Sequence, residues 1–168
     1  RTQEAFQYFK MLFQKGEISK TYLALVYGKL VPREGSVEKP ISLKSGTIRH
    51  TIHSGKMTKY AITHYKVLRY IGCREDEREQ CFSFLEAYPK TGRTHQIRVH
   101  MASTGHPIVG DALYGKKPRN LDRALPITHA SRLMLHAYAL EFTAPSGKRI
   151  RVEAEPPEEF SNYFDAQR

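Results

Sequence analysis

The segment 90–115, KTGRTHQIRVHMASTGHPIVGDALYG, gathers side chains that could bind an anion or move a proton. It holds two arginines, three histidines and four glycines. Gly92 is expected to break the chain between a strand that ends at Tyr88 and a helix over 94–104. Unpaired N–H groups and the positive end of the dipole make a helix start attractive to phosphate. With the charge of Arg93 added, the segment predicts one wall of a polyanion site, and an ordinary helix between two turns is the alternative.

The three histidines of this segment have the wrong spacing for a helical metal site. His95, His100 and His106 are five and six residues apart, whereas a helical ligand pair prefers a spacing of four. They are expected to make structural hydrogen bonds or to contact phosphate, and no metal is predicted. Arg98 lies between two apolar residues, and a half-buried guanidinium needs a carboxylate partner.

The composition predicts a globular protein with a phosphate-rich partner. The 168 residues are 40% hydrophobic and carry a net charge of +10, which favours nucleic acid. A soluble basic protein without a specific partner is the alternative. No apolar run has the length of a membrane span. The spacing of Cys73 and Cys81 fits neither a zinc pair nor a disulfide framework, so a reducing compartment and a cytoplasmic location are expected.

Periodicity and turn residues predict an α+β domain. A first helix is expected between the cap Thr2 and Gly16, followed by a buried central strand over 22–27. Strands are expected over 60–70 and 81–88, and a β-hairpin over 136–155. The basic stretch 42–59 is interpreted as a surface loop or loose hairpin, and 73–80 as a charged turn. Together these elements predict one domain over 1–168, with a mixed, mostly antiparallel sheet and flanking helices.

Several stretches together resemble the RluA-type pseudouridine synthases. The family signature Gly-Arg-Thr-His-Gln-Ile/Leu-Arg-Val-His-Met is matched by GRTHQIRVHM at 92–101, followed by GHPIVGD at 105–111 and Tyr114-Gly115. KTYLALVYG at 20–28 is similar to the family's tyrosine strand, and 59–68 and 132–142 are similar to later segments. The resemblance covers nearly the whole chain.

This resemblance implies an isomerase that breaks the C1′–N1 bond of uridine and rejoins the base through C5. By motif position, Tyr22 would stack on the target base, and Arg98 would pair with the catalytic aspartate. The partner would be structured RNA, either ribosomal or transfer RNA, and no cofactor is implied. Basic and polar side chains are expected to contact this RNA, namely Arg49, His50, Arg93, His95, Lys116, Lys117 and Arg119.

The sequence departs from the family pattern at the nucleophile. The segment His-Arg-Leu-Asp-x-x-Thr-Ser-Gly does not occur in it and is expected shortly before Arg1, together with N-terminal strands. Asp111 is expected to cap a turn instead. We therefore expect Arg98 to face a cleft without a carboxylate partner from this chain, and residues 1–168 to be inactive alone. A non-catalytic RNA-binding relative or assembly factor, or an unrelated basic α+β domain, are the alternatives.

Overall fold

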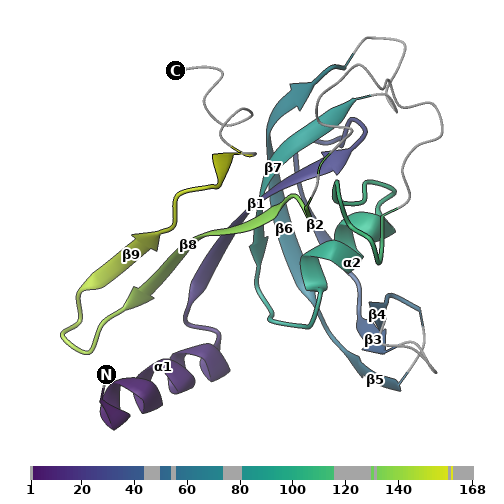
Figure 1. Cartoon of the computed structure of the whole chain (residues 1–168). Coiled ribbons are helices and arrows are strands. Elements are labelled where there is room, and N and C mark those ends of the chain that lie inside the picture. Colours follow the sequence, from purple (N-terminus) through teal and green to yellow (C-terminus); the bar gives the residue numbers. More distant parts are fainter. Residues whose placement is uncertain are drawn as a thin grey trace.

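A six-stranded antiparallel sheet forms the centre of the molecule. The computed structural model describes residues 2–43, 50–53, 56–73, 81–115, 130, 132–158 and 160. The strand order is β2-β6-β7-β1-β8-β9, and Figure 1 shows these strands crossing the molecule. Their bounds are β1 Ser19–Tyr27, β2 Glu34–Glu38, β6 Ile62–Ile71, β7 Phe82–Pro89, β8 Leu135–Thr143 and β9 Arg149–Glu153. All neighbouring strands described here pair antiparallel, which confirms the predicted α+β class.

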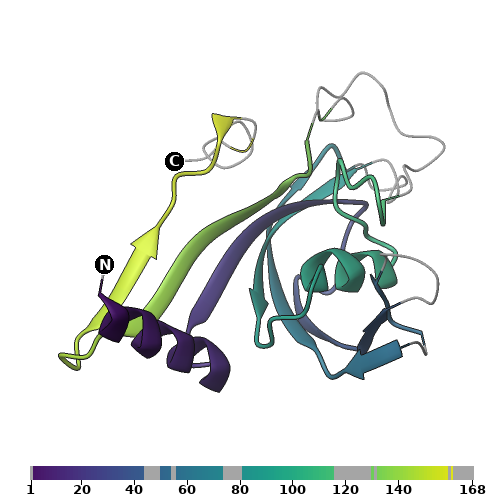
Figure 2. The same ribbon diagram turned by 60° about the horizontal axis from the view of Figure 1, so that its bottom comes forward.

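Strand β1 lies in the interior of the sheet because apolar residues occupy both of its faces. It pairs with β7 on one side and β8 on the other, and Leu23 to Val26 are fully buried. Helix α2 (Gln96–Ser103) lies in the hollow of the curved sheet (Figure 2) and contributes Ile97 and Met101 to the core. The predicted central strand and the predicted hairpin of β8 and β9 are both confirmed.

Helix α1 (Gln3–Lys15) has the ends that the sequence predicts. The Oγ1 of Thr2 accepts a hydrogen bond from Ala5 N, and Gly16 ends the helix at φ 72°. Leu12 is buried, but Phe6 is 60% and Phe13 is 56% exposed, so only some of the apolar side chains of the helix are buried. Among the described residues, neither α1 nor α2 has the length and apolar character needed to cross a membrane.

The basic stretch expected to be a loop contains a second, small sheet. Its strands are β3 Ile41–Leu43, β4 His50–Thr51 and β5 Lys56–Lys59, in the order β4-β3-β5. This sheet meets α2, since Ile41 packs against Val99 of the helix. The described part of 42–59 is therefore more regular than the surface loop or loose hairpin that was expected.

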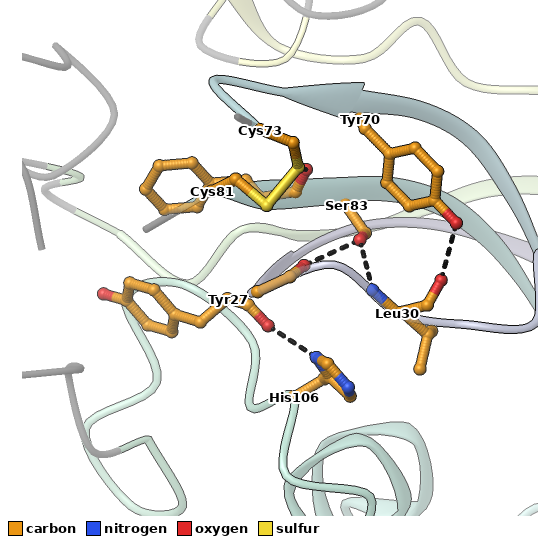
Figure 3. The surroundings of a disulfide bond; sticks show 9 residues. Tyr27, Leu30, Tyr70, Cys73, Cys81, Ser83 and His106 are labelled. Atoms are coloured by element: carbon orange, nitrogen blue, oxygen red, sulfur yellow. Dashed lines mark hydrogen bonds between the residues drawn. A yellow bond between two sulfur atoms is a disulfide. The ribbon is translucent and has the colours of Figure 1, made fainter. Parts of the chain in front are cut away.

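Cys73 and Cys81 form a disulfide, and the prediction that their spacing excludes one was wrong. Figure 3 shows the bond beyond the paired ends of β6 and β7. The two strands pair as far as Ile71 opposite Phe82, so the antiparallel register brings the two cysteines to a Cα–Cα distance of 4.6 Å. The spacing along the chain does not reveal this register. The cytoplasmic location expected from the sequence stays a prediction.

The turn after β1 lies below this disulfide and is fixed by side chains. The hydroxyl of Ser83 donates to Gly28 O and accepts from Leu30 N, at 2.7 and 2.9 Å. Tyr70 donates to Leu30 O, and the ring of His106 bonds to Tyr27 O (Figure 3). The bonds from Ser83 and Tyr70 hold the turn against β7 and β6, and the bond from His106 holds the end of β1 against the chain that follows α2.

Candidate functional site

A cleft of about 250 Å³ lies between β1 and the start of α2, and we call it the tyrosine cleft. Tyr22 and Lys20 of β1 form one wall, and Arg93, His95 and Arg98 come from the segment 93–98. Tyr22 and Lys20 are two positions apart, which places them on the same face of a strand. The structure thus brings together four residues that the resemblance selected, Tyr22, Arg93, His95 and Arg98. Their chemical roles stay predictions.

Gln96 fixes the loop that carries Arg93. Its Oε1 accepts from Arg93 N at 3.0 Å and from Thr91 Oγ1 at 2.7 Å, while its Nε2 donates to Ile62 O at 2.8 Å. The helix begins at Gln96, two residues later than predicted. Arg93 N–H is therefore already bonded, while the phosphate site expected at the helix start stays a prediction. Gln96 lies three residues after Arg93 and accepts from its N–H, as the glutamine of a capping box does. This spacing is the signal in the sequence that could have identified Gln96.

The side chain of Arg93 is anchored at one point only. Its Nε donates to Tyr60 O at 3.1 Å. Among the residues that the structure describes, its two terminal nitrogens have no hydrogen-bond partner. A guanidinium held in this way presents two donors in a plane, which matches the geometry of a phosphate. The predicted anion-binding role of Arg93 therefore rests on the side chain and not on the backbone.

Arg98 lines the tyrosine cleft but has a carboxylate partner within this chain, so the expectation of an unpaired Arg98 was wrong. Its Nε and Nη2 donate to the two carboxylate oxygens of Asp111, both at 2.8 Å. The Asp111 side chain is fully buried and that of Arg98 is 15% exposed. The bidentate pair satisfies a charge that would otherwise be costly to bury. Any further acid must therefore approach Arg98 from outside this pair.

Asp111 also caps the turn that follows it, as the sequence predicts. Its Oδ1 accepts from Leu113 N at 2.9 Å and Tyr114 N at 3.0 Å. Burial alone would raise the pKa of Asp111, but the hydrogen bonds from Arg98 and from these two backbone groups outweigh it, so the pKa is lowered. Gly110 permits the close approach that this turn needs, because a Cβ there would lie 1.9 Å from Arg132 O.

His95 connects the tyrosine cleft to β4 through a shared hydroxyl. The Tyr114 hydroxyl accepts from His50 N and lies 2.9 Å from Nδ1 of His95. Burial, with smaller contributions from Arg98 and His50, lowers the pKa of His95 despite the nearby Asp111. A neutral ring whose Nδ1 accepts a hydrogen bond from the Tyr114 hydroxyl fits this arrangement. His95 has φ 55°, a left-handed conformation in which histidine is enriched.

Lys20 is a cleft residue that sequence reasoning missed. Its Nζ lies 3.9 Å from the position of a Cβ at Gly92, so the amine reaches the loop across the cleft. Burial lowers the pKa of Lys20, and no described residue forms a hydrogen bond or ion pair with it. The sequence does contain a signal for it, because a residue two positions before Tyr22 in a strand lies on the same face of the sheet as Tyr22.

The other two histidines of the segment make structural hydrogen bonds. Buried His100 lies 2.9 Å from Thr63 Oγ1 and 3.0 Å from Lys39 O, and burial lowers its pKa. His106 bonds to Tyr27 O at 2.8 Å. In the described ranges no group of three histidine, cysteine or acidic side chains is placed to hold a metal ion.

Four of the residues expected to contact RNA lie outside the described ranges, namely Arg49, Lys116, Lys117 and Arg119.

A larger cavity of about 330 Å³ lies beside the tyrosine cleft and shares Lys20 with it. Two carboxylates line this cavity, Glu86, which accepts from Tyr88, and Glu141, which accepts from Arg151. Its chemistry is therefore less suited to an anionic ligand than that of the tyrosine cleft.

The structure is thus an α+β domain whose cationic cleft is walled by a tyrosine. A family model described as RNA pseudouridylate synthase matches residues 1–103. The chain belongs to this family, and the resemblance to its RluA-type members is confirmed.

Curated bacterial relatives match almost all of the chain. The ribosomal large subunit pseudouridine synthase D of Nitrosomonas europaea is 37% identical over 161 residues, which are 92% of this chain and 42% of that protein. An uncharacterized RNA pseudouridine synthase of Helicobacter pylori is 35% identical and covers 98% of this chain and 54% of its own length. The chain thus spans about half the length of the curated relatives it matches.

Solved human structures share the fold. Human RNA pseudouridylate synthase domain containing 1 superposes with a TM-score of 0.74 at 27% identity, covering 93% of this chain and 62% of its own. The domain containing 4 protein has a TM-score of 0.72 at 22% identity, covering 98% of this chain and 67% of its own. The pseudouridine synthase fold predicted from the motifs is therefore confirmed.

Proposed function

We propose that this chain is part of an RNA pseudouridine synthase and that the tyrosine cleft holds the target uridine. One observation carries the proposal: Tyr22 of β1 and the side chains of Arg93, His95 and Arg98 from the distant segment 93–98 line one cleft. A uridine must leave its stack before an enzyme can reach its glycosidic bond. The Tyr22 ring would replace the lost stacking, and the cations would hold the flanking phosphates.

The proposed reaction is redox-neutral. The C1′–N1 bond of uridine breaks, a C1′–C5 bond forms, C5 loses a proton and N1 gains one. Residues of this chain would bind and orient the base, while the resemblance assigns the nucleophile to an aspartate in a His-Arg-Leu-Asp segment. Because Arg98 already binds Asp111 through Nε and Nη2, its proposed contribution is a fixed positive charge on the cleft wall.

A second candidate, an RNA-binding relative without catalysis, is favoured by the composition of the cleft. None of the described residues that line it is an aspartate or glutamate. Isomerisation needs a carboxylate placed against the ribose and the base, so residues 1–168 alone would bind RNA without modifying it. The two candidates differ in whether the protein changes the RNA in the cell.

The deciding experiment is a pseudouridine map of cellular RNA after Tyr22→Ala is introduced into the gene. We expect pseudouridine to disappear from one or a few positions. Ribosomal RNA should be examined first, because the Nitrosomonas relative is named for the large ribosomal subunit, and transfer RNA second. Tyr22→Phe is the matched control, since it keeps the ring that stacks on a base. An unchanged map combined with weaker RNA binding would favour the non-catalytic candidate, and no change in either would refute both.

A further inference from the structure

A second cleft of about 200 Å³ lies on the other side of the loop that carries Arg93. Ile41 and Leu43 of β3 line it together with His50 of β4. It shares Gly92 and Arg93 with the tyrosine cleft. One loop is therefore a wall common to both clefts.

The two clefts are of similar and limited size. Both volumes, 250 and 200 Å³, fall below the roughly 300 Å³ at which sites for drug-sized ligands begin. Each is therefore better suited to a single heterocyclic base than to a larger ligand. Two neighbouring nucleotides of one strand could occupy the two clefts, and the phosphate that links them would then lie at the shared wall.

Arg93 is suited to bind that linking phosphate. It lines both clefts, and its Nε bond to Tyr60 O holds the side chain while both terminal nitrogens have no partner among the described residues. Lys59 of β5 adds a second cation at the second cleft. It is exposed and has no ion-pair partner in the described part of the chain.

Met57 provides an apolar surface at this cleft. Its side chain is 72% exposed, the largest exposure among the described large hydrophobic residues. Its backbone has φ 55°, a conformation that is unfavourable for residues with a Cβ. This strained backbone places an apolar side chain on a cleft wall, and such strain clusters at ligand sites.

We propose that the second cleft binds the base of a nucleotide adjacent to the target uridine, and that Arg93 binds the phosphate between the two. The base lies against Met57 and the apolar residues of β3, while Lys59 and Arg93 neutralise the backbone. This inference rests on the proposed function, because it takes the target uridine to occupy the tyrosine cleft. It assigns a substrate class, namely single-stranded or flipped-out RNA with at least two unstacked bases.

The test measures binding of a fluorescent five-nucleotide RNA, AAUAA, to the chain by anisotropy. Two further oligonucleotides lack the base on the 5′ or on the 3′ side of the uridine but keep the sugar and phosphate. We expect one of these two to bind about tenfold more weakly to the parent chain, near the lower end of base-stacking effects. Met57→Ser should weaken binding of AAUAA similarly and should abolish the difference between the two oligonucleotides.

Val152→Ser is the matched control, because Val152 is 54% exposed on β9 and lines neither cleft. It should leave every affinity unchanged. If removal of a flanking base lowers the RNA affinity of the Met57→Ser variant as much as that of the parent chain, the second cleft does not bind a base. Weaker binding after Tyr22→Ala would show in that case that the proposed function stands without the second subsite. If AAUAA binds neither the parent chain nor any variant, both proposals fail.

Discussion

At the scale of single residues, Arg98 and Lys20 of the tyrosine cleft differ in that only Arg98 has an acidic partner within the described ranges. Arg98 has its carboxylate in Asp111, whereas Lys20 has no partner among the described residues. A paired buried charge is needed for stability, and an unpaired one reduces it. The two residues should therefore respond to substitution in opposite ways.

Lys20→Met should bind RNA more weakly and yet be at least as stable as the parent chain. Burial lowers the pKa of Lys20 in the folded chain. The charged ammonium therefore lowers the free energy of unfolding at neutral pH, and the uncharged variant avoids this loss. The gain in the free energy of unfolding should shrink as the pH rises towards the ordinary lysine value of about 10.4. Urea denaturation and RNA anisotropy measure the two effects. Lys20→Arg is the control that keeps the charge, and a clearly less stable methionine variant would refute an unpaired ammonium.

Asp111→Asn should lower the free energy of unfolding by about 3 kcal/mol, the lower end of the cost of breaking a buried ion pair. The folded pKa of Asp111 is lowered, so its stabilising effect is complete above the unfolded value of about 3.9 and is lost as the pH falls through the folded value. Denaturation curves of parent and variant should differ most above about pH 5 and converge in acid. A difference that does not change with pH would contradict the ion pair as its cause.

At the scale of elements, the start of α2 positions the site through one side chain. Gln96 is buried and joins the loop residues Thr91 and Arg93 to the beginning of β6. The loop is the common wall of the two clefts. A change at Gln96 should therefore reach both clefts although its own bonds are structural.

Gln96→Ala should destabilise the fold by about 2 kcal/mol, because it leaves buried donors and acceptors unsatisfied. It should also weaken RNA binding, since Arg93 loses the bond that fixes its backbone. Hydrogen exchange of Arg93 N–H should become faster in the variant. The comparison variant is Thr2→Ala, which removes the cap of α1 and should cost about 1 kcal/mol with no effect on RNA affinity. Unchanged exchange at Arg93 would contradict this role of Gln96.

At the scale of the whole molecule, which carries a net charge of +10, some cations of the described ranges have acidic partners there and others do not. The arginines of β9 are paired with acids of β8 and β9, as Arg149 is with Glu141. The cations around the two clefts, Lys20, Lys59 and Arg93, have no such partners in the described ranges. The attraction to RNA should therefore be concentrated at the clefts.

Affinity for single-stranded RNA should fall steeply with salt, by a log–log slope of about −0.7 for each phosphate contacted. Arg93→Gln should make this slope shallower by roughly one contact. Arg149→Gln removes the same charge from β9 and should leave the slope unchanged. Anisotropy titrations across a salt series decide the matter, and equal slopes for the two variants would mean that overall charge, not the clefts, binds the RNA.

The sequence by itself determined what depends on neighbouring residues. Thr2 and Gly16 set the ends of α1, apolar residues on both faces identified β1, and the motif at 92–101 identified the family. Local hydrogen bonds and side-chain periodicity act within a few residues, so a pattern can predict them.

Only the tertiary structure decided which distant side chains meet. Asp111 reaches Arg98 because the chain reverses after α2 and Gly110 passes against Arg132. Cys73 meets Cys81 because of the register of β6 and β7, and the second cleft exists because the small sheet meets the loop at Arg93. Such contacts follow from the packing of whole elements, which decides which polar groups lie close enough to pair. The spacing of residues along the chain does not contain that information.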